Sequence, residues 1–310
     1  MRITFIQKGS AYQRHDFSRQ LSILKNAFPA AKVTVLHSEY HGHAFELAAT
    51  ASGTSDYLIA VGGDGTLHEV VNGSMSTRNS DAEAPLPVFG VMPFGRNNDF
   101  IHALNISGDM DELCGMLEQD SIRLIDLGRM RFHSADGGSD ERFFVNVTDV
   151  GIGASVLKHL VTGGKYLGGN LKYLEAILAS VFEYKHIELR VETDEGLCFE
   201  GKMLAVIAAN GRCSGEGLCF APGARLDDGR LFISIIHDLR VVDLMRNLHR
   251  FRMRAELEHK KIEYHSANWM RVKAIGGVVP VQADGEFLGN APLEVDILPR
   301  EIRFLGTDEQ

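Results

Sequence analysis

Apolar and polar positions alternate in two different ways along this chain, and the change comes near residue 123. Before it, short apolar runs rich in β-branched residues predict strands at 3–6, 32–36, 57–61 and 88–92. Apolar residues at spacings of three and four predict helices at 17–28, 43–51 and 66–75. Strands and helices that alternate in this way predict a mostly parallel sheet with helices on both faces.

Beyond residue 123 the β-rich runs follow one another with only turns between most of them. They lie at 121–127, 141–147, 187–192, 203–209, 231–236, 269–274 and 278–283. Closely spaced strands of this kind predict an antiparallel, sandwich-like domain. Two helical patterns, at 171–184 and 241–258, predict helical insertions in it. A last apolar run, at 301–305, predicts a final strand.

One stretch of the first region carries candidate chemistry. The strand at 57–61 leads into Gly62-Gly63-Asp64-Gly65-Thr66, and a helical pattern follows. Thr66 and Glu69 match a capping box, which predicts that the helix begins at Thr66. Glycines between a strand and a helix N-terminus let backbone N–H groups approach a phosphate, and the helix dipole favours its charge. Three glycines alone are equally typical of a tight turn with a surface Asp.

The chemistry of Asp64 decides between these interpretations. A carboxylate beside bound phosphate is repulsive unless it holds Mg²⁺ or takes a proton. Further along the chain, Asp284-Gly285-Glu286 sets two acids on either side of a glycine. Acids in a tight turn suit proton transfer, although Asp-Gly is also a common hairpin signal. Asp64 could be a base or a metal ligand, and the sequence does not divide these roles among the three acids.

GGDGT followed by LHEVVNG, at residues 62–73, resembles the catalytic domain of the diacylglycerol kinase family, which includes bacterial lipid kinases and the sphingosine and ceramide kinases. GGDGT alone is shared with NAD kinases. Further matches run in order to the end of the chain: VNV at 145–147, GIGA at 151–154, ANG at 209–211, APGA at 221–224, DDG at 227–229 and DGE at 284–286. NAD kinases lack this second series, so the resemblance favours the lipid kinases.

The resemblance implies a fold like that of NAD kinases and diacylglycerol kinases. An α/β domain that binds nucleotide, with a mostly parallel sheet, is expected over residues 1–122. A β-rich domain for the lipid substrate, antiparallel and sandwich-like with helical insertions, is expected over 123–299. The strand at about 300–310 is expected to return to the first domain, as it does in the family.

The resemblance also implies the sites. It places ATP against Ser38, Gly62, Gly63, Asp64, Gly65, Thr66, Gly95, Arg96, Asn98 and Asp99. It makes Glu286 the acceptor of the alcohol proton, with Asp284 beside it and Asp64 as a third acid. It places a structural or regulatory Mg²⁺ at Asp228 and the backbone carbonyls of Arg225 and Arg230. Hard oxygen ligands of this kind are what Mg²⁺ prefers.

Two departures from the family pattern keep an alternative open. Arg96 stands where the family usually has Thr, whose hydroxyl contacts nucleotide phosphate, and Gln7-Lys8 stands where the family usually has Asn-Pro. An Arg forms strong phosphate contacts, but it could also block the site. The alternative is therefore a non-catalytic nucleotide- or lipid-binding protein on the same fold, and an NAD kinase is the third.

Composition narrows the partners. A formal net charge of −9 over 310 residues makes nucleic acid an unexpected partner. Four cysteines without a CxxC pair predict neither a metal cluster nor a disulfide framework, and suit a reducing cytoplasm. The start resembles no signal peptide, and apolar runs fall short of the roughly 18 residues that span a bilayer.

Membrane contact is therefore expected to be peripheral, on a cytoplasmic protein. Residues 240–261 carry seven Lys or Arg against three Asp or Glu, which predicts either a face attracted to anionic lipid or a solvated helix face. The sequence thus predicts an ATP-dependent, Mg²⁺-requiring lipid kinase of phospholipid metabolism. It would transfer the γ-phosphoryl of ATP to a hydroxyl of diacylglycerol or a related lipid. A homodimer is left open.

Overall fold

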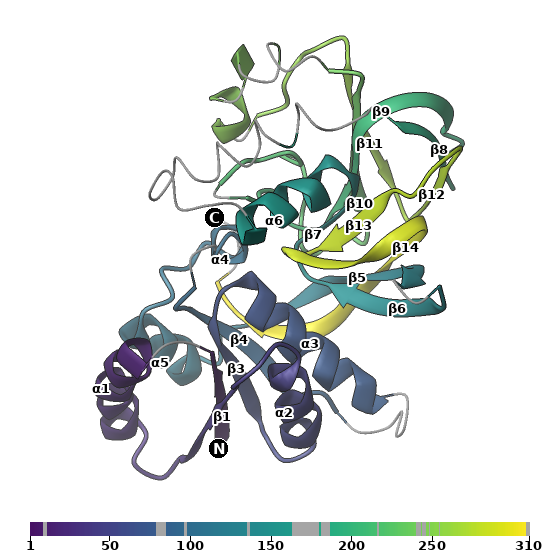
Figure 1. The fold of residues 1–310 in the computed structure, drawn as a ribbon. Helices are drawn as coiled ribbons and strands as arrows, with labels where there is room; N and C mark the ends of the chain where they lie inside the picture. The colour runs from purple at the N-terminus through teal and green to yellow at the C-terminus, as the bar shows by residue number, and fades with distance from the viewer. Residues whose placement is uncertain are drawn as a thin grey trace. The chain divides into compact units, whose positions relative to one another are not determined.

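The computed structural model describes the chain except residues 9–10, 79–84, 96–97, 135–136, 163–179, 181–186, 216, 240–242, 244–245, 248, 254 and 308–310. The chain divides into two compact units (Figure 1). The first comprises Met1–Ile125 and Arg300–Gln310, and the second is Asp126–Pro299. Within the described segments, no helix is both long and apolar enough to cross a membrane.

The first unit alternates strands and helices. In chain order they are β1 (Arg2–Gln7), α1 (Ala11–Ala27), β2 (Lys32–His37), α2 (His43–Ser52), β3 (Tyr57–Gly62), α3 (Asp64–Arg78), β4 (Val88–Pro93), α4 (Phe100–Leu104) and α5 (Met110–Glu118). The strands run side by side in the order β4-β3-β1-β2, and the pairs β3/β4, β1/β3 and β1/β2 are parallel. The end of β14 (Glu286–Leu305) joins β4 in parallel, where Phe304 lies opposite Phe89.

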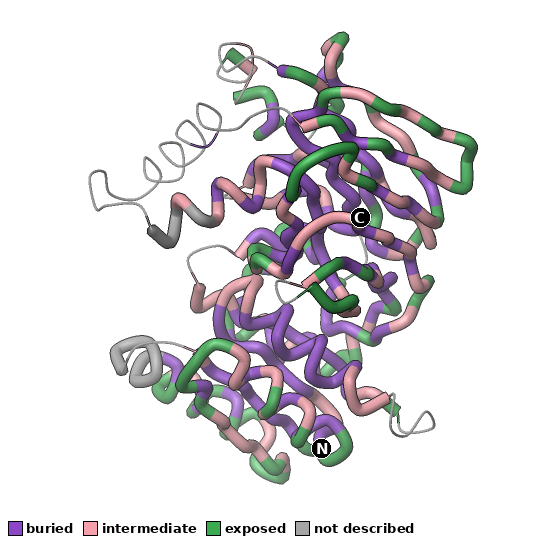
Figure 2. The backbone as a smooth tube through the Cα atoms, turned by 45° about the vertical axis from the view of Figure 1, so that its right-hand side comes forward, coloured by how far each residue is buried: buried purple, intermediate pink, exposed green. Residues whose placement is uncertain are grey.

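These strands are buried on both faces, which explains their continuous apolar runs. Leu58, Ile59 and Ala60 are fully buried in succession in β3, as are Phe5 and Ile6 in β1. Figure 2 colours the buried stretches of the chain purple. A parallel sheet brings the carboxyl ends of its strands to one edge. The segments that follow β1 to β4 therefore lie together at that edge of the first unit, where ligands bind in open α/β sheets.

The second unit is built of antiparallel strands. It contains β5 (Ile122–Ser134), β6 (Ser139–Phe144), β7 (Val147–Gly151), α6 (Ile152–Thr162), β8 (Ile187–Thr193), β9 (Cys198–Ala209), β10 (Leu231–His237), η1 (Arg250–Arg252), β11 (Ile262–Ala267), β12 (Trp269–Ala274), β13 (Pro280–Ala283) and most of β14. Its pairs include β7/β9, β7/β13, β9/β10 and β13/β14. Among the strand pairs of the described residues, antiparallel ones outnumber parallel ones.

Strand β9 packs two apolar clusters at once. Val206 and Ala208 belong to one cluster, whereas Ala205, Ile207 and Ala209 belong to the other. Because side chains alternate along a strand, the two sets leave opposite faces of the sheet. The central strands of the second unit are therefore covered on both sides, and their ends are held rigidly where β7, β9 and β13 lie next to one another.

The capping box predicted at Thr66 is wrong. Helix α3 begins at Asp64, two residues earlier, and Thr66 N–H donates to the carbonyl of Gly63 at 2.9 Å. The carboxylate of Glu69 points to α2 instead, where its Oε2 accepts the N–H of Ala44 at 3.0 Å. A tertiary contact has taken the side chain that the local pattern assigned to the helix's own N-terminus.

The predicted helical insertions fare differently. The one at 171–184 lies outside the described residues, apart from Ser180. In the one at 241–258, a short 3₁₀ helix covers Arg250–Arg252 and residues 255–259 have no helical structure. A continuous helix over that range is therefore wrong, although Phe251 is buried as its apolar spacing required.

The cysteine pattern, which predicted no disulfide framework, did not reveal the one disulfide of the described residues. Cys213 and Cys219 are bonded, with their Cα atoms 3.9 Å apart. Between them Ser214 and Leu218 form an isolated antiparallel bridge, with Ser214 N–H donating to Leu218 carbonyl at 2.9 Å. The two cysteines thus face each other across a tight hairpin. The absence of a CxxC pair could not reveal this cross-strand placement.

Candidate functional site

The glycine turn of the first unit is packed too tightly for side chains. Gly62 ends β3, and a Cβ there would overlap the side chain of Thr66 in the first turn of α3. Thr66 itself is only 3% exposed. The turn therefore presents mainly backbone at the carboxyl edge of the sheet, as an anion site requires.

A second glycine loop, after β4, lies directly against the first. Phe94 N–H donates to the carbonyl of Gly62 at 3.1 Å. A Cβ on Gly95 would overlap the backbone of Gly63, so only glycine allows this approach. Asn98 closes the second loop, because its Oδ1 accepts Gly95 N–H at 3.2 Å and its Nδ2 donates to Gly95 carbonyl at 3.0 Å.

Asp64 joins the two loops. Its carboxylate accepts the N–H of Asp99 at 3.0 Å and that of Phe100 at 3.2 Å, one on each oxygen. Both N–H groups lie at the start of α4, so the charge of Asp64 also lies at a helix N-terminus. Asp99 is 4% exposed. The structure thus gives Asp64 a structural task, which the sequence did not indicate.

Two more of the predicted residues lie at the same edge. Ser38 follows β2, and its N–H donates at 2.9 Å to the carbonyl of Gln7, which ends β1. Both side chains are buried. The structure therefore brings Ser38, the two glycine loops, Asn98 and Asp99 together within the first unit. Arg96 lies outside the described residues.

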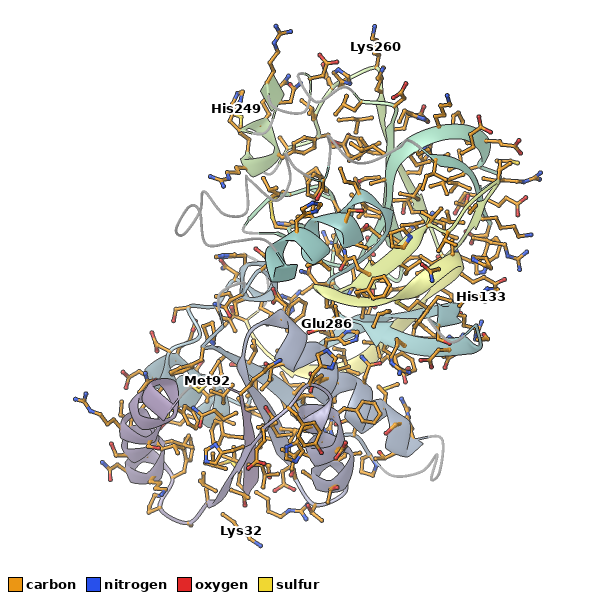
Figure 3. The ribbon with its side chains drawn as sticks, viewed as in Figure 1. Lys32, Met92, His133, His249, Lys260 and Glu286 are labelled. Carbon is orange, nitrogen blue, oxygen red and sulfur yellow. A yellow bond between two sulfur atoms is a disulfide. The ribbon has the colours of Figure 1, made fainter. Side chains whose placement is uncertain are left out.

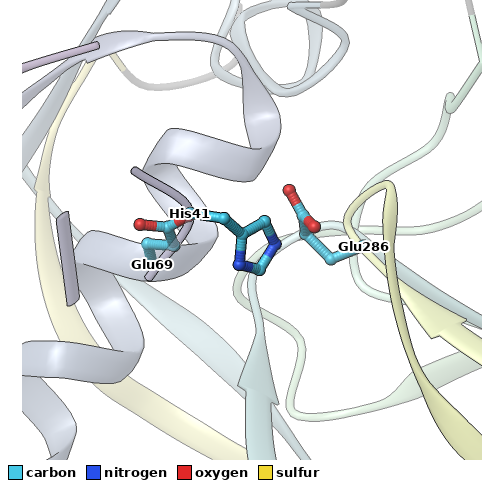
Figure 4. A group of neighbouring side chains, drawn as sticks. All are labelled: His41, Glu69 and Glu286. Carbon is cyan, nitrogen blue, oxygen red and sulfur yellow. The ribbon is translucent and has the colours of Figure 1, made fainter. Parts of the chain in front are cut away.

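Glu69 is an acid that sequence reasoning missed, because it was assigned to the capping box. It is 5% exposed and projects from α3 (Figure 4). Within the first unit, ligand atoms of Glu69 and His41 lie within 4.8 Å of one another. A buried carboxylate and an imidazole at this spacing are compatible ligands for a metal ion.

The acidic motif of the second unit is a two-residue hairpin. Asp284 and Gly285 have φ values of 48° and 84°, and Ala283 pairs with Glu286 on either side. Two central residues with positive φ are what a type I′ turn needs, which explains the Asp-Gly pair. The turn sets Glu286 at the first position of β14 (Figure 3). The interpretation of Asp-Gly as a hairpin signal is therefore confirmed for the backbone conformation.

Asp284 serves as the anchor of this hairpin. Its carboxylate accepts three backbone N–H groups, those of Val145, Asn146 and Val147, each at 3.0 Å. The side chain is 4% exposed. A carboxylate so engaged holds the turn against the segment between β6 and β7. Glu286, the other acid of the pair, lies at the start of β14.

The polar residues around that anchor form a continuous network. Asn146 Nδ2 donates to the carbonyl of Cys213 at 3.0 Å. Asn210 Nδ2 donates to the carbonyls of Asp126 and Val145 at 2.9 and 3.0 Å. Both amides are buried. Asn146 and Asn210 thus connect strand ends of the second unit. The motif match pointed to these two residues, but it did not show which contacts they make.

Comparison with known proteins settles the family. The sequence matches the diacylglycerol kinase catalytic domain over residues 7–130. It matches the YegS C-terminal NAD kinase beta sandwich-like domain over residues 146–306, which is more than half of the chain. The chain belongs to the diacylglycerol kinase catalytic-domain family. The resemblance inferred from the sequence motifs is confirmed.

Similar proteins carry the family name. A diacylglycerol kinase of Staphylococcus haemolyticus (strain JCSC1435) is 27% identical over 249 residues, which cover 80% of this chain and 70% of that protein. A diacylglycerol kinase of Staphylococcus aureus (strain bovine RF122 / ET3-1) is 28% identical over 249 residues, covering 80% of this chain and 73% of that protein.

Solved structures share the fold. The crystal structure of a diacylglycerol kinase from Bacillus anthracis str. Sterne has a TM-score of 0.70 at 18% identity and covers 99% of this chain and 96% of that one. An NAD kinase from Archaeoglobus fulgidus in complex with ATP has a TM-score of 0.52 at 14% identity, with coverage of 99% and 94%. The fold is thus that of NAD kinases and diacylglycerol kinases, with a β-sandwich-like C-terminal domain.

The residues predicted to hold Mg²⁺ lie on a turn before β10. Asp228 is exposed, and its Oδ1 accepts Arg230 N–H at 3.0 Å. Gly229 has a φ of 71°, and its N–H donates to the buried Asp126 at 2.6 Å. Arg225 is paired with Asp227 through its guanidinium, at 3.5 Å. An exposed carboxylate beside backbone carbonyls is an oxygen donor set that fits Mg²⁺.

Proposed function

We propose that this member of the diacylglycerol kinase family is an ATP-dependent lipid kinase. It transfers the γ-phosphoryl group of ATP to a hydroxyl of diacylglycerol or a related lipid. The observation that carries the proposal is the hairpin at residues 284–286, in which one acid is fixed by three backbone N–H groups and the other heads β14. A rigid turn that presents one acid suits a positioned general base.

The nucleotide is assigned to the first unit. Gly62, Gly63 and Gly95 bring two stretches of backbone together without side chains, next to the N-terminus of α3. Backbone N–H groups at a helix N-terminus favour phosphate. Ser38 and Asn98 lie at the same edge of the sheet, where they would contact other parts of the nucleotide. The NAD kinase of the same fold was crystallised with ATP, which supports the choice of nucleotide.

The reaction needs few covalent steps from the protein. Glu286 accepts the proton of the lipid hydroxyl as the alcohol oxygen bonds to the γ-phosphorus, and ADP leaves with the electrons of the broken P–O bond. Asp284 holds the turn, so that Glu286 keeps its direction. Asp64 keeps the two glycine loops in register through its bonds to Asp99 and Phe100.

Mg²⁺ fits the donor set of the second unit. Asp228, with the carbonyls of Arg225 and Arg230, would hold it in a structural or regulatory role. A bound Mg²⁺ supplies positive charge that offsets the phosphates of the nucleotide.

A lipid substrate implies that this cytoplasmic protein binds peripherally to a membrane. Arg250 and Arg252 lie on η1, next to Met253, which is 68% exposed, and Lys260 and Lys261 follow. Basic residues near an anionic surface contribute about 1 kcal/mol each. An exposed Met among cations is compatible with an interfacial contact, and this is how the protein would reach a lipid alcohol.

Phosphorylation of lipids by the purified chain tests the proposal. The protein is incubated with γ-labelled ATP, Mg²⁺ and mixed micelles that contain diacylglycerol, ceramide, sphingosine or monoacylglycerol, and the extracted lipids are separated. We expect label in one lipid class. Nucleotide binding without label in any class would instead support the non-catalytic alternative, which Arg96 motivates. Label in NADP⁺, when NAD⁺ is the acceptor, would identify an NAD kinase.

A further inference from the structure

Two buried side chains hold the acidic hairpin, and Asp284 is one of them. The second is the amide of Gln282, which lies two residues before Asp284 and is 5% exposed. Its Oε1 accepts the N–H of Gly285 at 3.1 Å. Its Nε2 donates to Oδ2 of Asp149, which lies directly opposite it on β7.

We propose that Gln282 and Asp149 are positioning residues of the kinase, and that they fix the direction of Glu286 through Gly285. The inference rests on the proposed function of Glu286 as the base. It assigns to both residues a role that differs from the core or sheet role expected of buried side chains in paired strands.

The orientation of the Gln282 amide follows from its neighbours. A backbone N–H can only donate, so the amide oxygen must face Gly285. A carboxylate can accept from the NH₂ group at the other end, so the amide nitrogen faces Asp149. One side chain therefore connects a buried acid to the central peptide group of the hairpin, without an alternative arrangement of comparable pairing.

Asp149 is held firmly enough to support this contact. It is 6% exposed, and Gly153 in the first turn of α6 lies close against it. A Cβ at Gly153 would overlap the carboxylate, so the helix start is shaped around it. A negative charge at the N-terminus of a helix is favourable. Oδ1 has no hydrogen-bond partner among the described residues, so the contact of Gln282 with Oδ2 matters for the carboxylate.

The consequence for Glu286 is geometric. Asp284 and Gly285 are the two central residues of the turn, and each is fixed by a different buried group. Asp284 is also held through its own N–H, which donates to the carbonyl of Val147 at 2.9 Å, whereas Gln282 holds the N–H of Gly285, next to Glu286. A displacement of about 1 Å in a reacting group can cost about 10²-fold in rate, so loss of the second contact should be visible in kcat.

The test is a set of variants at Gln282 and Asp149, assayed for lipid phosphorylation and for thermal unfolding. Gln282→Leu removes both hydrogen bonds at nearly the same volume. We expect its kcat to fall by about 10- to 100-fold, as for a misplaced group, with the KM for ATP unchanged within about twofold. Ser234→Ala is the matched control, because Ser234 lies on β10 of the same unit and its hydroxyl donates a part-buried hydrogen bond to the carbonyl of Phe220. It should lower Tm with kcat intact.

A second test exchanges the amide of Gln282 and the acid of Asp149, and it remains informative if Gln282→Leu fails to fold. Gln282→Glu sets two carboxyl groups against each other and should lower kcat. The added change Asp149→Asn restores a donor opposite an acceptor, since Glu at 282 can then accept from Asn at 149 and from Gly285. We expect the double variant to recover most of the loss.

A second readout separates positioning from folding. In a Glu286→Gln background there is no base to direct, so Gln282→Leu should change kcat by less than about twofold; neighbouring groups that act as a unit are non-additive in this way. Equal losses in both backgrounds would overturn the proposal, as would a folded Gln282→Leu enzyme with normal kcat. No turnover by the wild-type protein would instead overturn the proposed function, and the positioning role with it.

Discussion

The carboxylate of Asp284 accepts the N–H of Asn146 at 3.0 Å, and the amide of Asn146 in turn donates to Cys213 at 3.0 Å. This chain of contacts joins the acidic hairpin to a disulfide-closed loop within one unit. It separates two neighbouring acids by task, since Asp284 maintains the turn and Glu286 is the proposed base.

Asp284→Asn should mainly lower the free energy of unfolding. Asn has one acceptor oxygen for the N–H groups of Val145, Asn146 and Val147, and its NH₂ group would face at least one of them. Hydrogen bonds to a buried charge contribute about 1.5–3 kcal/mol each, so we expect a loss of about 2–4 kcal/mol in the free energy of unfolding. Urea unfolding measures it. Wild-type stability in this variant would show that Asp284 is no anchor.

Asp64→Ala should impair nucleotide binding and loosen the first unit. It removes the acceptor for Asp99 and Phe100 N–H groups, which costs about 1–3 kcal/mol of stability, and it frees the second glycine loop. Calorimetry should show weaker ATP binding.

The matched control for that variant is Asp109→Ala. Asp109 caps α5 in the same unit, where its Oδ1 accepts Glu112 N–H at 2.8 Å. Its loss should cost about 1 kcal/mol without affecting ATP. If the two variants bind ATP equally well, Asp64 has no special task in the loops.

Asp149 should make stability fall as pH rises. Burial raises the pKa of its carboxyl group from 3.8 to about 6. Between about pH 4 and about pH 6 the folded state therefore holds a proton that the unfolded state has released, so the free energy of unfolding decreases with pH and is constant above. Two pKa units correspond to about 3 kcal/mol.

The measurement compares wild type with Asp149→Asn, since other carboxylates titrate in the same range. Urea unfolding at several pH values should show the wild type losing stability relative to the variant through this window. A constant difference between the two proteins would mean that Asp149 has an ordinary pKa.

The disulfide should contribute measurably to stability. A bridge between residues six apart closes a short loop, for which chain entropy predicts about 2 kcal/mol. Dithiothreitol should lower the Tm of the wild type and leave that of Cys213→Ser/Cys219→Ser unchanged. If the reductant leaves the Tm of the wild type unchanged, and the double Ser variant has that same Tm, the bridge contributes nothing to stability.

The sequence predicted the strands of the first unit and the glycine loops well, because apolar runs and glycine turns have local causes. Backbone crowding at Gly62 and Gly95 is visible only in three dimensions, but glycine itself was the signal. The capping box failed because Glu69 has a competing partner, Ala44, that is distant in sequence. A local motif does not show which contact a buried carboxylate will take.

The roles of the buried polar groups could not be read from the sequence. Gln282 lies in a predicted strand just before the DGE motif, and Asp149 lies between the VNV and GIGA motifs, and they meet because β7 and β13 are paired. Asp284 and Glu286 look alike as acids beside a glycine. Their difference arises from the N–H groups of 145–147, which strand pairing brings to one of them.

Turnover of Glu286→Gln, measured beside the wild type in the lipid phosphorylation assay, tests the central claim most directly. The substitution keeps the shape and removes the base, so kcat should fall by about 10²–10⁴-fold while ATP affinity holds or improves slightly. A variant within about threefold of an active wild type would contradict the account, because that is far from the loss of a general base.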